Sequence, residues 1–591
     1  MKKVVSILLS AVMAVSLAAC GAPASSSTTA PAAGSGTFAG EGSGKGGKIQ
    51  IELTLENNEI KDIVIGENNE TPGYADAMEQ MKQAMLASNQ IEVDGVTGAT
   101  FSSKGFLEAV KDAFAKSGLA ESDLKAKDVA PVESTMNDSY EADVVVVGAG
   151  GAGLSAAISA AENGAQVILI EKMNNLGGNT LISGGEMAAP GNWLQKEAGI
   201  EDDVETFYND ILKGGDNEND PALVRIVADN ALNAATWLRD EIGMEFEDYL
   251  LFFGGHSVKR SLVPKNATGV EMIQKLTAKA ESLGVQIFTN TAAGKLLTEN
   301  NTVTGVEAEN NGKTITFKAG SGVVLTTGGF GSNLEMRKAN NPDMDEKILS
   351  TNSVGSTGDG ITMARALGAQ TVDMQYIQTY PTCDPETGAL LYVGDVRLEG
   401  RAILVNLEGK RFVEELERRD VISMATTQQT GGVSYLYFDE ASMQAAGVAE
   451  SHKTEYEDLI ARGILVKADS VAEAAAHFGI NAEELQATID RYNQYCADGK
   501  DLEFNKRGEL TPFEAGTCYI MKSQPAIHHT MGGLKINPSA QVIGENDQPI
   551  AGLYAAGEVT GDIHGTNRLG SDAIADIVVF GRIAGQNAAA K

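Results

Sequence analysis

The chain has 591 residues, 43% of them hydrophobic and 21% charged, which is the composition of an ordinary globular protein with room for several domains. Its 80 acidic residues outnumber its 46 basic residues, and the resulting net charge of −34 repels nucleic acid and anionic lipid headgroups. Composition and charge therefore exclude a disordered chain, and we expect no binding to nucleic acid.

The first residues have the pattern of an export signal. Lys2 and Lys3 precede an apolar run at 4–17 that is too short to cross a membrane, and Leu17-Ala18-Ala19-Cys20 ends it. These last residues resemble a bacterial lipobox, in which a lipid would be attached to Cys20; the alternative is a plain secretory signal that contains a cysteine. The sequence predicts an extracytoplasmic protein that is held to the cell membrane by a lipid anchor only.

Composition and periodicity divide the rest of the chain. Alternating apolar residues predict strands at 49–55 and 60–65, helical spacing predicts a helix at 78–87, and together they indicate a small α+β domain. The segment 142–147, which ends in four consecutive valines, is typical of a strand buried on both faces of a parallel sheet. The expected segments are a signal peptide at 1–19, a flexible tether at 20–47, the small domain at 48–117, a linker at 118–140 and an α/β body from 141 onward.

A glycine-rich turn, Gly148-Ala149-Gly150-Gly151-Ala152-Gly153, follows the strand at 142–147 and opens an alanine-rich helix. Gly148 permits a tight turn, Gly150 lets the backbone approach a pyrophosphate, and Gly153 lets helix and strand pack closely. Glu171, at the end of the next predicted strand, stands where an acid takes ribose hydroxyls. A purely structural turn is the alternative, but the full context predicts a dinucleotide site.

Further motifs indicate which dinucleotide is bound. They are Glu171-Lys172 followed by Gly177-Gly178-Asn179-Thr180, Ser183-Gly184-Gly185, Val323 to Phe330, Thr357-Gly358-Asp359-Gly360 and Gly552 to Val559. From 141 to 591 the chain resembles the flavoprotein family of fumarate reductase and succinate dehydrogenase subunits rather than NAD dehydrogenases. The resemblance implies a Rossmann-like domain for non-covalent FAD, split into 141–374 and 528–591, with an inserted α+β capping domain at 375–527. The residues that it places at FAD are Gly148, Gly150, Ala152, Gly153, Glu171, Asn179, Thr180, Gly184, Gly185, Asp359, His529, Glu558, Ala573 and Ile574.

A second flavin is indicated by Asp94-Gly95-Val96-Thr97-Gly98-Ala99-Thr100-Phe101-Ser102-Ser103, which resembles the flavinylation signal of small FMN-binding domains. The resemblance implies a phosphoester between FMN and Thr100, made by a flavin transferase; a plain turn before a helix at 105–115 is the alternative. The chain has no Cys-x-x-Cys-His motif for haem, and we expect no metal because iron–sulfur and zinc spacings are absent from its sequence. FMN would relay electrons from a quinol or NADH dehydrogenase of the membrane.

Two segments, Ala526 to Gly533 and His564 to Ser571, resemble those that bind a substrate carboxylate in this family. The resemblance assigns the carboxylate to His528 and Arg568 and places Ser571 beside the substrate. An arginine fork suits a carboxylate because it donates two parallel hydrogen bonds.

The segment Asn406 to Asp420 resembles the stretch with the family's catalytic arginine, and counting from Asn406 gives Arg419. The resemblance implies hydride transfer from flavin N5 and a proton from Arg419, which is replenished through Asp395 and Arg397. The relay segment has one residue more than the family pattern, and a solvated helix face is the alternative for Arg418 and Arg419.

The segment Gln378-Thr379-Tyr380-Pro381-Thr382 lacks the histidine that holds fumarate's second carboxylate in fumarate reductases. Tyr380 with Asp395 is instead similar to urocanate reductases, where an aspartate can accept an imidazole N–H. The prediction is an oxidoreductase acting on a CH–CH group that converts urocanate to dihydrourocanate (imidazole propionate) in anaerobic respiration. Fumarate or a cinnamate-type arylacrylate is the alternative substrate, and a surface electron-carrier lipoprotein or a steroid-type desaturase is the alternative function.

Overall fold

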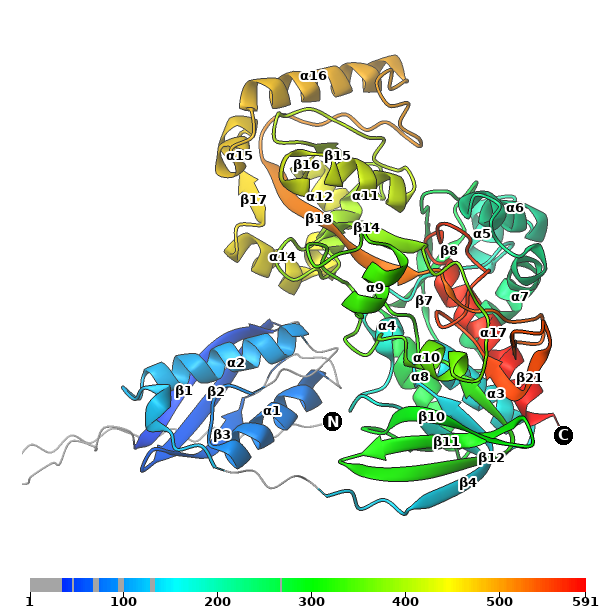
Figure 1. Cartoon of the computed structure of the whole chain (residues 1–591). Coiled ribbons are helices and arrows are strands. Elements are labelled where there is room, and N and C mark those ends of the chain that lie inside the picture. The colour runs from blue at the N-terminus through cyan, green and yellow to red at the C-terminus, as the bar shows by residue number, and fades with distance from the viewer. Residues whose placement is uncertain are drawn as a thin grey trace, which may run out of the picture.

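The computed structural model describes residues 35–44, 47–66, 68, 74–93, 100–127, 133–265 and 268–590. The predicted signal peptide and Cys20 lie outside these residues, as do residues 94–99 of the predicted flavinylation segment; Thr100 begins a helix, but its side chain is not among those described. Figure 1 shows a small N-terminal domain in blue, a larger sheet domain that combines cyan, green and red segments, and a yellow and orange domain above it. Within the described ranges, no helix combines the length and apolarity needed to cross a membrane.

The N-terminal domain is an antiparallel three-stranded sheet covered by two helices (Figure 1). The turn between its second and third strands is formed by Asn57 and Asn58, both with left-handed backbones (φ 54° and 63°) of the kind favoured in tight hairpins. Alternate residues such as Ile49, Ile51 and Leu53 are buried under the helices, as the period-two pattern predicts. The elements are β1 (Gly36–Gly44), β2 (Gly47–Glu56), β3 (Glu59–Ile65), α1 (Tyr74–Ser88) and α2 (Thr100–Ala115).

Strand β1 corrects the predicted tether at 20–47, because Gly36–Gly44 pairs along its whole length with β2. Its composition is poor in apolar residues, which is why the sequence favoured a flexible segment. The reason that it folds is close packing: a Cβ atom on Gly40 would lie 2.0 Å from the carbonyl oxygen of Ala109 on α2. Glycine thus allows the backbone of α2 to rest directly on the strand.

The second domain is built on an eight-stranded, mostly parallel sheet with the order β10-β11-β21-β12-β4-β5-β9 and β20 beside β21. Val144 to Val147 are fully or almost fully buried, in agreement with the unbroken apolar run. The strands are β4 (Ser139–Val147), β5 (Val167–Ile170), β9 (Gln286–Phe288), β10 (Ala292–Glu299), β11 (Thr302–Asn310), β12 (Lys313–Leu325), β20 (Gln541–Ile543) and β21 (Pro549–Ala555).

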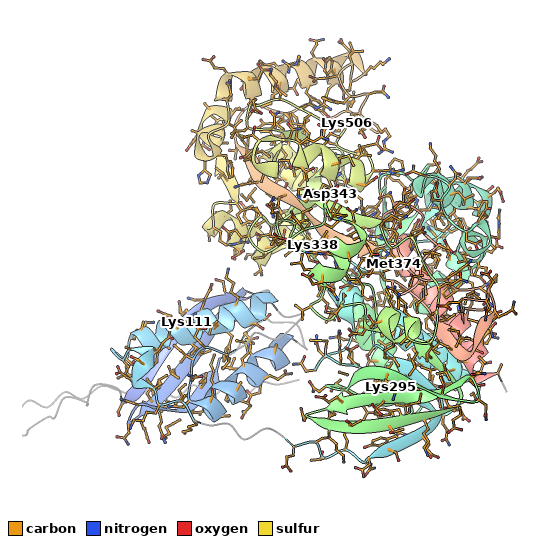
Figure 2. The ribbon with its side chains drawn as sticks, in the orientation of Figure 1. Lys111, Lys295, Lys338, Asp343, Met374 and Lys506 are labelled. Carbon is orange, nitrogen blue, oxygen red and sulfur yellow. The ribbon has the colours of Figure 1, made fainter. Side chains whose placement is uncertain are left out.

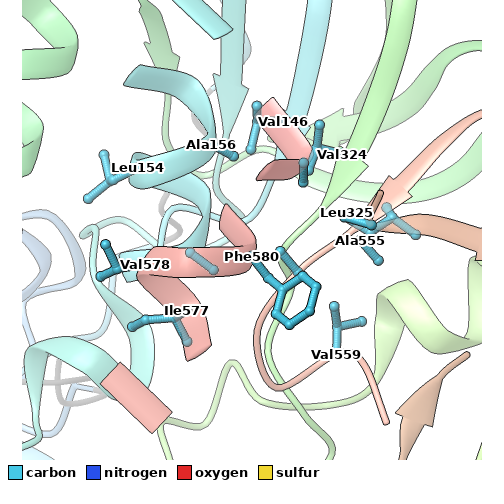
Figure 3. Close-up of a cluster of buried hydrophobic side chains, with 14 of the residues drawn as sticks. Val146, Leu154, Ala156, Val324, Leu325, Ala555, Val559, Ile577, Val578 and Phe580 are labelled. Carbon is cyan, nitrogen blue, oxygen red and sulfur yellow. The ribbon is translucent and has the colours of Figure 1, made fainter. Parts of the chain in front are cut away.

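Strand β21 comes from the end of the chain yet pairs in parallel with β12, with Val323 opposite Leu553. Helix α17 (Asp572–Ala589) then packs on α3 (Gly151–Glu162), the helix that follows β4. Figure 3 shows this core, in which Phe580 of α17 lies among valine, leucine and alanine side chains of the sheet. The two segments predicted to share one domain, 141–374 and 528–591, therefore contribute to a single sheet and core.

The remaining elements of the second domain cover the sheet and form its edge toward the third domain. Helix α7 starts where Asp220 accepts the backbone N–H of Ala222 and Pro221 occupies the first turn. These elements are α4 (Gly178–Leu181), β6 (Met187–Ala188), α5 (Trp193–Ala198), α6 (Val204–Gly214), α7 (Pro221–Asp240), β7 (Phe246–Leu251), β8 (Ser261–Pro264), α8 (Gly269–Ser282), α9 (Leu334–Asn340), α10 (Asp359–Arg365), β13 (Thr371–Val372) and β19 (Gly533–Leu534).

The third domain corresponds to the predicted capping domain and has its own sheet, in the order β14-β18-β16-β15 with β17 beside β18. Its core contains a buried ionic cluster in which Arg411 contacts Glu415 at 2.7 Å and Asp501 at 2.9 Å; Lys506, labelled in Figure 2, lies 3.9 Å from the same glutamate. Strand β18 runs through the predicted boundary at 527/528, so the chain returns to the second domain along a continuous strand. The elements are β14 (Ile377–Cys383), the 3-10 helix η3 (Tyr392–Arg397), β15 (Ile403–Val405), α11 (Arg419–Thr427), β16 (Ser434–Asp439), α12 (Glu440–Ala446), α13 (Val448–Ser451), α14 (Lys453–Ala461), β17 (Leu465–Ala468), α15 (Val471–Phe478), α16 (Ala482–Asp498) and β18 (Cys518–Thr530).

Candidate active site

The glycine-rich turn between β4 and α3 lines a cavity. Gly148 has a left-handed backbone (φ 99°), and a Cβ on Gly153 would lie 1.9 Å from the carbonyl oxygen of Gly148, so each glycine is required by the turn. Gly150 faces open space, with its nearest neighbour 3.7 Å from a Cβ placed there. The N-terminus of α3 and this open backbone fit a pyrophosphate.

Glu171 closes the cavity at the end of β5. Its carboxylate accepts the backbone N–H of Ala149 at 2.8 Å and of Met173 at 2.9 Å, and burial raises its pKa. The neighbouring Lys172 is paired with Asp359 at 2.6 Å on the same wall. These polar groups lie where the ribose of a dinucleotide would follow the pyrophosphate, so the cavity fits the FAD that the resemblance implies.

The predicted FAD residues are divided between this cavity and a second one that adjoins it. The two share Asn179, Thr180, Glu558 and Ile577, and Glu558 is fixed by hydrogen bonds from Asn179 Nδ2 at 3.0 Å and from the backbone N–H of Thr530 at 3.0 Å. Gly153 and Gly185 line neither cavity. The first cavity is lined by Gly148, Gly150, Ala152, Glu171 and Asp359, and the second by Gly184, His529, Ala573 and Ile574.

The second cavity has cationic and imidazole groups at one side. The Arg568 guanidinium donates to the carbonyl oxygen of Leu569 at 3.0 Å and to Gln378 Oε1 at 3.2 Å, while its Nε has no protein partner. The Nδ1 atom of His528 lies 2.9 Å from Thr351 Oγ1, and burial lowers the pKa of His528 well below its usual value, which favours neutral imidazole. A guanidinium and an imidazole N–H can together hold one carboxylate.

Arg419 is the first residue of α11 and reaches the same cavity. Its guanidinium carbon lies 4.9 Å from the ring centre of Tyr380 and 5.9 Å from that of Phe253, and burial lowers its pKa. The preceding Arg418 points elsewhere and pairs with Asp216 and Asp420. The solvated-face alternative therefore does not describe Arg419, and the count from Asn406 selects the arginine that lines the cavity.

Two carboxyl groups, those of Asp395 and Glu186, line the cavity together with the arginines. Burial raises the pKa of both, and the charge of Glu186 raises that of Asp395 further, whereas the charge of Arg419 lowers both. No motif includes Glu186, although it stands directly after Ser183-Gly184-Gly185. Phe253 lies on an irregular loop and belongs to no motif either.

The structure separates the two residues of the predicted proton relay. Asp395 lines the cavity, whereas Arg397 is buried behind it and donates from Nη1 to the carbonyl oxygen of Glu415 at 2.6 Å. Both belong to the 3-10 helix η3, in which residues two apart point to different sides because one turn takes three residues. The charge of Arg397 still lowers the pKa of Asp395, although Arg397 itself does not line the cavity.

Ser571 completes the wall at the start of α17. It has a left-handed backbone (φ 67°), which is uncommon outside glycine, and its Oγ lies 2.6 Å from Ser261 Oγ. Its carbonyl oxygen accepts the backbone N–H of Ala188 at 3.3 Å, and Ser571 lines the cavity together with Arg568.

Comparisons with known proteins place this site in a family. The profile of the FAD binding domain matches residues 143–574, which is most of the chain. The chain belongs to this family. A second profile, that of the FMN-binding domain, matches residues 44–115.

Named relatives agree with the family resemblance. Urocanate reductase of Eggerthella lenta is 49% identical over 552 residues, which cover 93% of this chain and 91% of that protein. NADH:fumarate oxidoreductase of Klebsiella pneumoniae is 37% identical over 92% of this chain but only 57% of its own length. A solved structure, the open conformation of a flavocytochrome c3 fumarate reductase, has a TM-score of 0.64 at 38% identity and covers 76% of this chain and 78% of its own.

The predicted family and α/β fold are thus confirmed, and the chain is a flavoprotein oxidoreductase of the class that acts on carbon–carbon double bonds. It has both an FAD-binding and an FMN-binding domain. The individual residue roles, the lipid anchor and the covalent FMN remain predictions.

Proposed function

We propose that this protein reduces the carbon–carbon double bond of urocanate to give dihydrourocanate (imidazole propionate). The observation that carries the proposal is the charge distribution of the second cavity, where Arg568 and His528 lie in one pocket with the carboxyl groups of Glu186 and Asp395. Urocanate has a carboxylate at one end and a basic imidazole at the other. A protonated imidazole would favour ionisation of Glu186 and Asp395, whose pKa values are raised by burial, whereas these carboxyl groups would repel the second carboxylate of fumarate.

The protein groups suit a reduction in which one carbon receives a hydride and its neighbour a proton. Bound FAD would supply the hydride. Arg568 and His528 would hold the carboxylate and stabilise the negative charge that develops next to it, and Arg419 would donate the proton to the carbon beside that carboxylate. Asp395 would return a proton to Arg419, with Arg397 adjusting its pKa from behind. The net change is two electrons and two protons added to the double bond.

Electrons would reach FAD from a covalent FMN on Thr100, attached by a flavin transferase and reduced by a quinol or NADH dehydrogenase of the membrane. Support comes from the match of an FMN-binding domain at 44–115 and from the flavinylation resemblance of the segment 94–103. A lipid on Cys20 would hold the protein outside the cytoplasm in anaerobic respiration. Mass spectrometry of the exported protein tests both attachments, and Thr100→Val should remove FMN while FAD remains.

The substrate is tested by anaerobic turnover of the holoenzyme with reduced methyl viologen and urocanate, cinnamate or fumarate. We expect selective reduction of urocanate. Glu186→Gln should lower kcat/KM for urocanate but leave that for cinnamate, which has no basic ring nitrogen, equal or higher. Asp395→Asn should lower kcat/KM for both substrates, because it also interrupts the proposed return of the proton to Arg419. A preference for fumarate would mean that the carboxyls do not select the substrate, and no turnover of any enoate would favour a surface electron carrier.

A further inference from the structure

The turn between α6 and α7 links two segments that come from distant parts of the sequence. Asp216 in this turn has a left-handed backbone (φ 57°), and its carboxylate accepts two hydrogen bonds from Arg418, from Nη1 at 2.7 Å and from Nη2 at 3.1 Å. The same carboxylate accepts the hydroxyl of Thr566 at 2.5 Å. One acidic side chain therefore joins the capping domain to the C-terminal segment.

Each partner of Asp216 stands next to an arginine of the cavity. Arg418 directly precedes Arg419 at the start of α11, and Thr566 comes two residues before Arg568. The turn adds a backbone bond to the second segment, since the N–H of Thr566 donates to the carbonyl oxygen of Gly215 at 3.2 Å. One short turn thus contacts the chain directly beside each of the two cavity arginines.

A second loop packs between the same two segments. A Cβ atom on Gly254 would lie 2.8 Å from the carbonyl oxygen of Glu417, and one on Gly255 would lie 2.4 Å from a methyl group of Leu569. The backbone of this loop is therefore in close contact with the backbone of the capping domain at Glu417 and with the side chain of Leu569. This packing leaves little freedom for Arg418 to pair with Asp216 in any other relative position of the two domains.

An exposed ion pair usually contributes little, but a bidentate arginine in a network is the exception. Here Arg418 is 19% exposed, and its guanidinium is also held by Asp420 at 2.7 Å and 3.1 Å. The guanidinium of Arg418 is therefore held by two carboxylates, that of Asp420 and that of Asp216. Asp216 itself is half exposed, so its exchange should not create a buried cavity.

We infer that Asp216 is a positioning residue: through Arg418 and Thr566 it fixes the spacing between Arg419 and Arg568 when the capping domain lies against the FAD domain. The inference rests on the roles proposed above for these two arginines. The carbon that receives the proton is bonded to the carboxylate, so the proton donor and the carboxylate clamp must be spaced to match one small fragment. Misplacement by about 1 Å can cost about 100-fold in rate.

The test uses the holoenzyme with reduced methyl viologen and the enoate that wild type reduces fastest. We expect Asp216→Asn and Arg418→Gln each to lower kcat/KM about 100-fold. The effect of the double variant should be much smaller than the two single effects combined, because both exchanges remove the contact between Asp216 and Arg418. Asp216→Glu should recover part of the rate, and FAD content and the rate of flavin reduction by viologen should stay unchanged.

The matched control is Glu205→Gln, which breaks another bidentate pair between the two helices that the turn connects, Arg225 of α7 with Glu205 of α6 at 3.0 Å and 3.2 Å. It should behave as wild type. The inference is refuted if Asp216→Asn stays within 3-fold of wild type, if the two single effects add, or if activity only follows a melting temperature that Glu205→Gln lowers equally. Absence of turnover by wild type would instead refute the proposed function, and the inference with it.

Discussion

Exchange of Arg568 for lysine tests the proposed carboxylate clamp while keeping its charge. The guanidinium uses two of its five N–H groups on Leu569 and Gln378, which leaves three for a ligand, including the unpartnered Nε–H. A lysine ammonium has three N–H groups, so it would retain only one for the substrate after satisfying the same two acceptors. The loss of a charged hydrogen bond costs about 1.5–3 kcal/mol, which predicts a kcat/KM about 10- to 150-fold lower for Arg568→Lys.

The assay is anaerobic steady-state reduction of urocanate, together with titration of the oxidised enzyme by the change in flavin absorbance on binding. The amide of urocanate serves as a probe without a carboxylate, and the difference between wild type and Arg568→Lys should largely disappear with it. Arg365→Lys, the same exchange on an exposed position of α10, is the control. A variant that binds and reduces urocanate as wild type does would refute the assignment of Arg568 to the carboxylate.

Three further predictions concern stability, each measured by urea unfolding of the full chain. Burial raises the pKa of Asp373 to about 6, so between about pH 4 and pH 6 the native state binds a proton that the unfolded state has lost. The contribution of this proton to the free energy of unfolding should be full below about pH 4 and be lost as the pH rises through 6. Asp373→Asn should remove this dependence of stability on pH, and an unchanged pH dependence would contradict the prediction. Gly40→Ala should destabilise the N-terminal domain by about 1–3 kcal/mol or more, because its Cβ would overlap the backbone of Ala109, and a neutral effect would mean that β1 does not pack there. Arg411→Leu should cost about 3–5 kcal/mol, because it leaves the two buried carboxylates Glu415 and Asp501 with Lys506 as their nearby buried cation, and adding Glu415→Leu should recover much of this loss by restoring the charge balance.

The parts of the fold that the sequence predicts are those with a strong local pattern. The unbroken apolar strand before Gly148 and the alternating residues of β2 determine which faces are buried, so their positions follow from the chain alone. Strand β1 could not be predicted in this way, because its burial depends on glycines that accept the backbone of a helix 60 to 70 residues later. Close packing of that kind has no periodic signature.

The candidate site divides along the same line. Arg568, His528 and Arg419 stand in motifs, and the structure brings all three to one cavity. Arg397 stands in a motif too, but it follows Asp395 by two residues in one short helix, and side chains at that spacing do not share a face in a 3-10 helix or in an α-helix. The place of Glu186 in the cavity depends on how two domains lie against each other, which only the tertiary structure shows.

The path of strand β18 has a consequence for the ancestry and engineering of the enzyme. Tyr380 of β14 pairs with Ala526 of β18, and the same strand carries His528, whereas Arg568 comes from the segment that leads into α17. The two groups proposed to bind the carboxylate thus belong to different domains: one is on a strand of the capping sheet, and the other is on a segment of the FAD domain. A chimera that receives a foreign capping domain would also receive half of a foreign anion clamp, so new substrate specificity and retained carboxylate recognition would have to be inherited together.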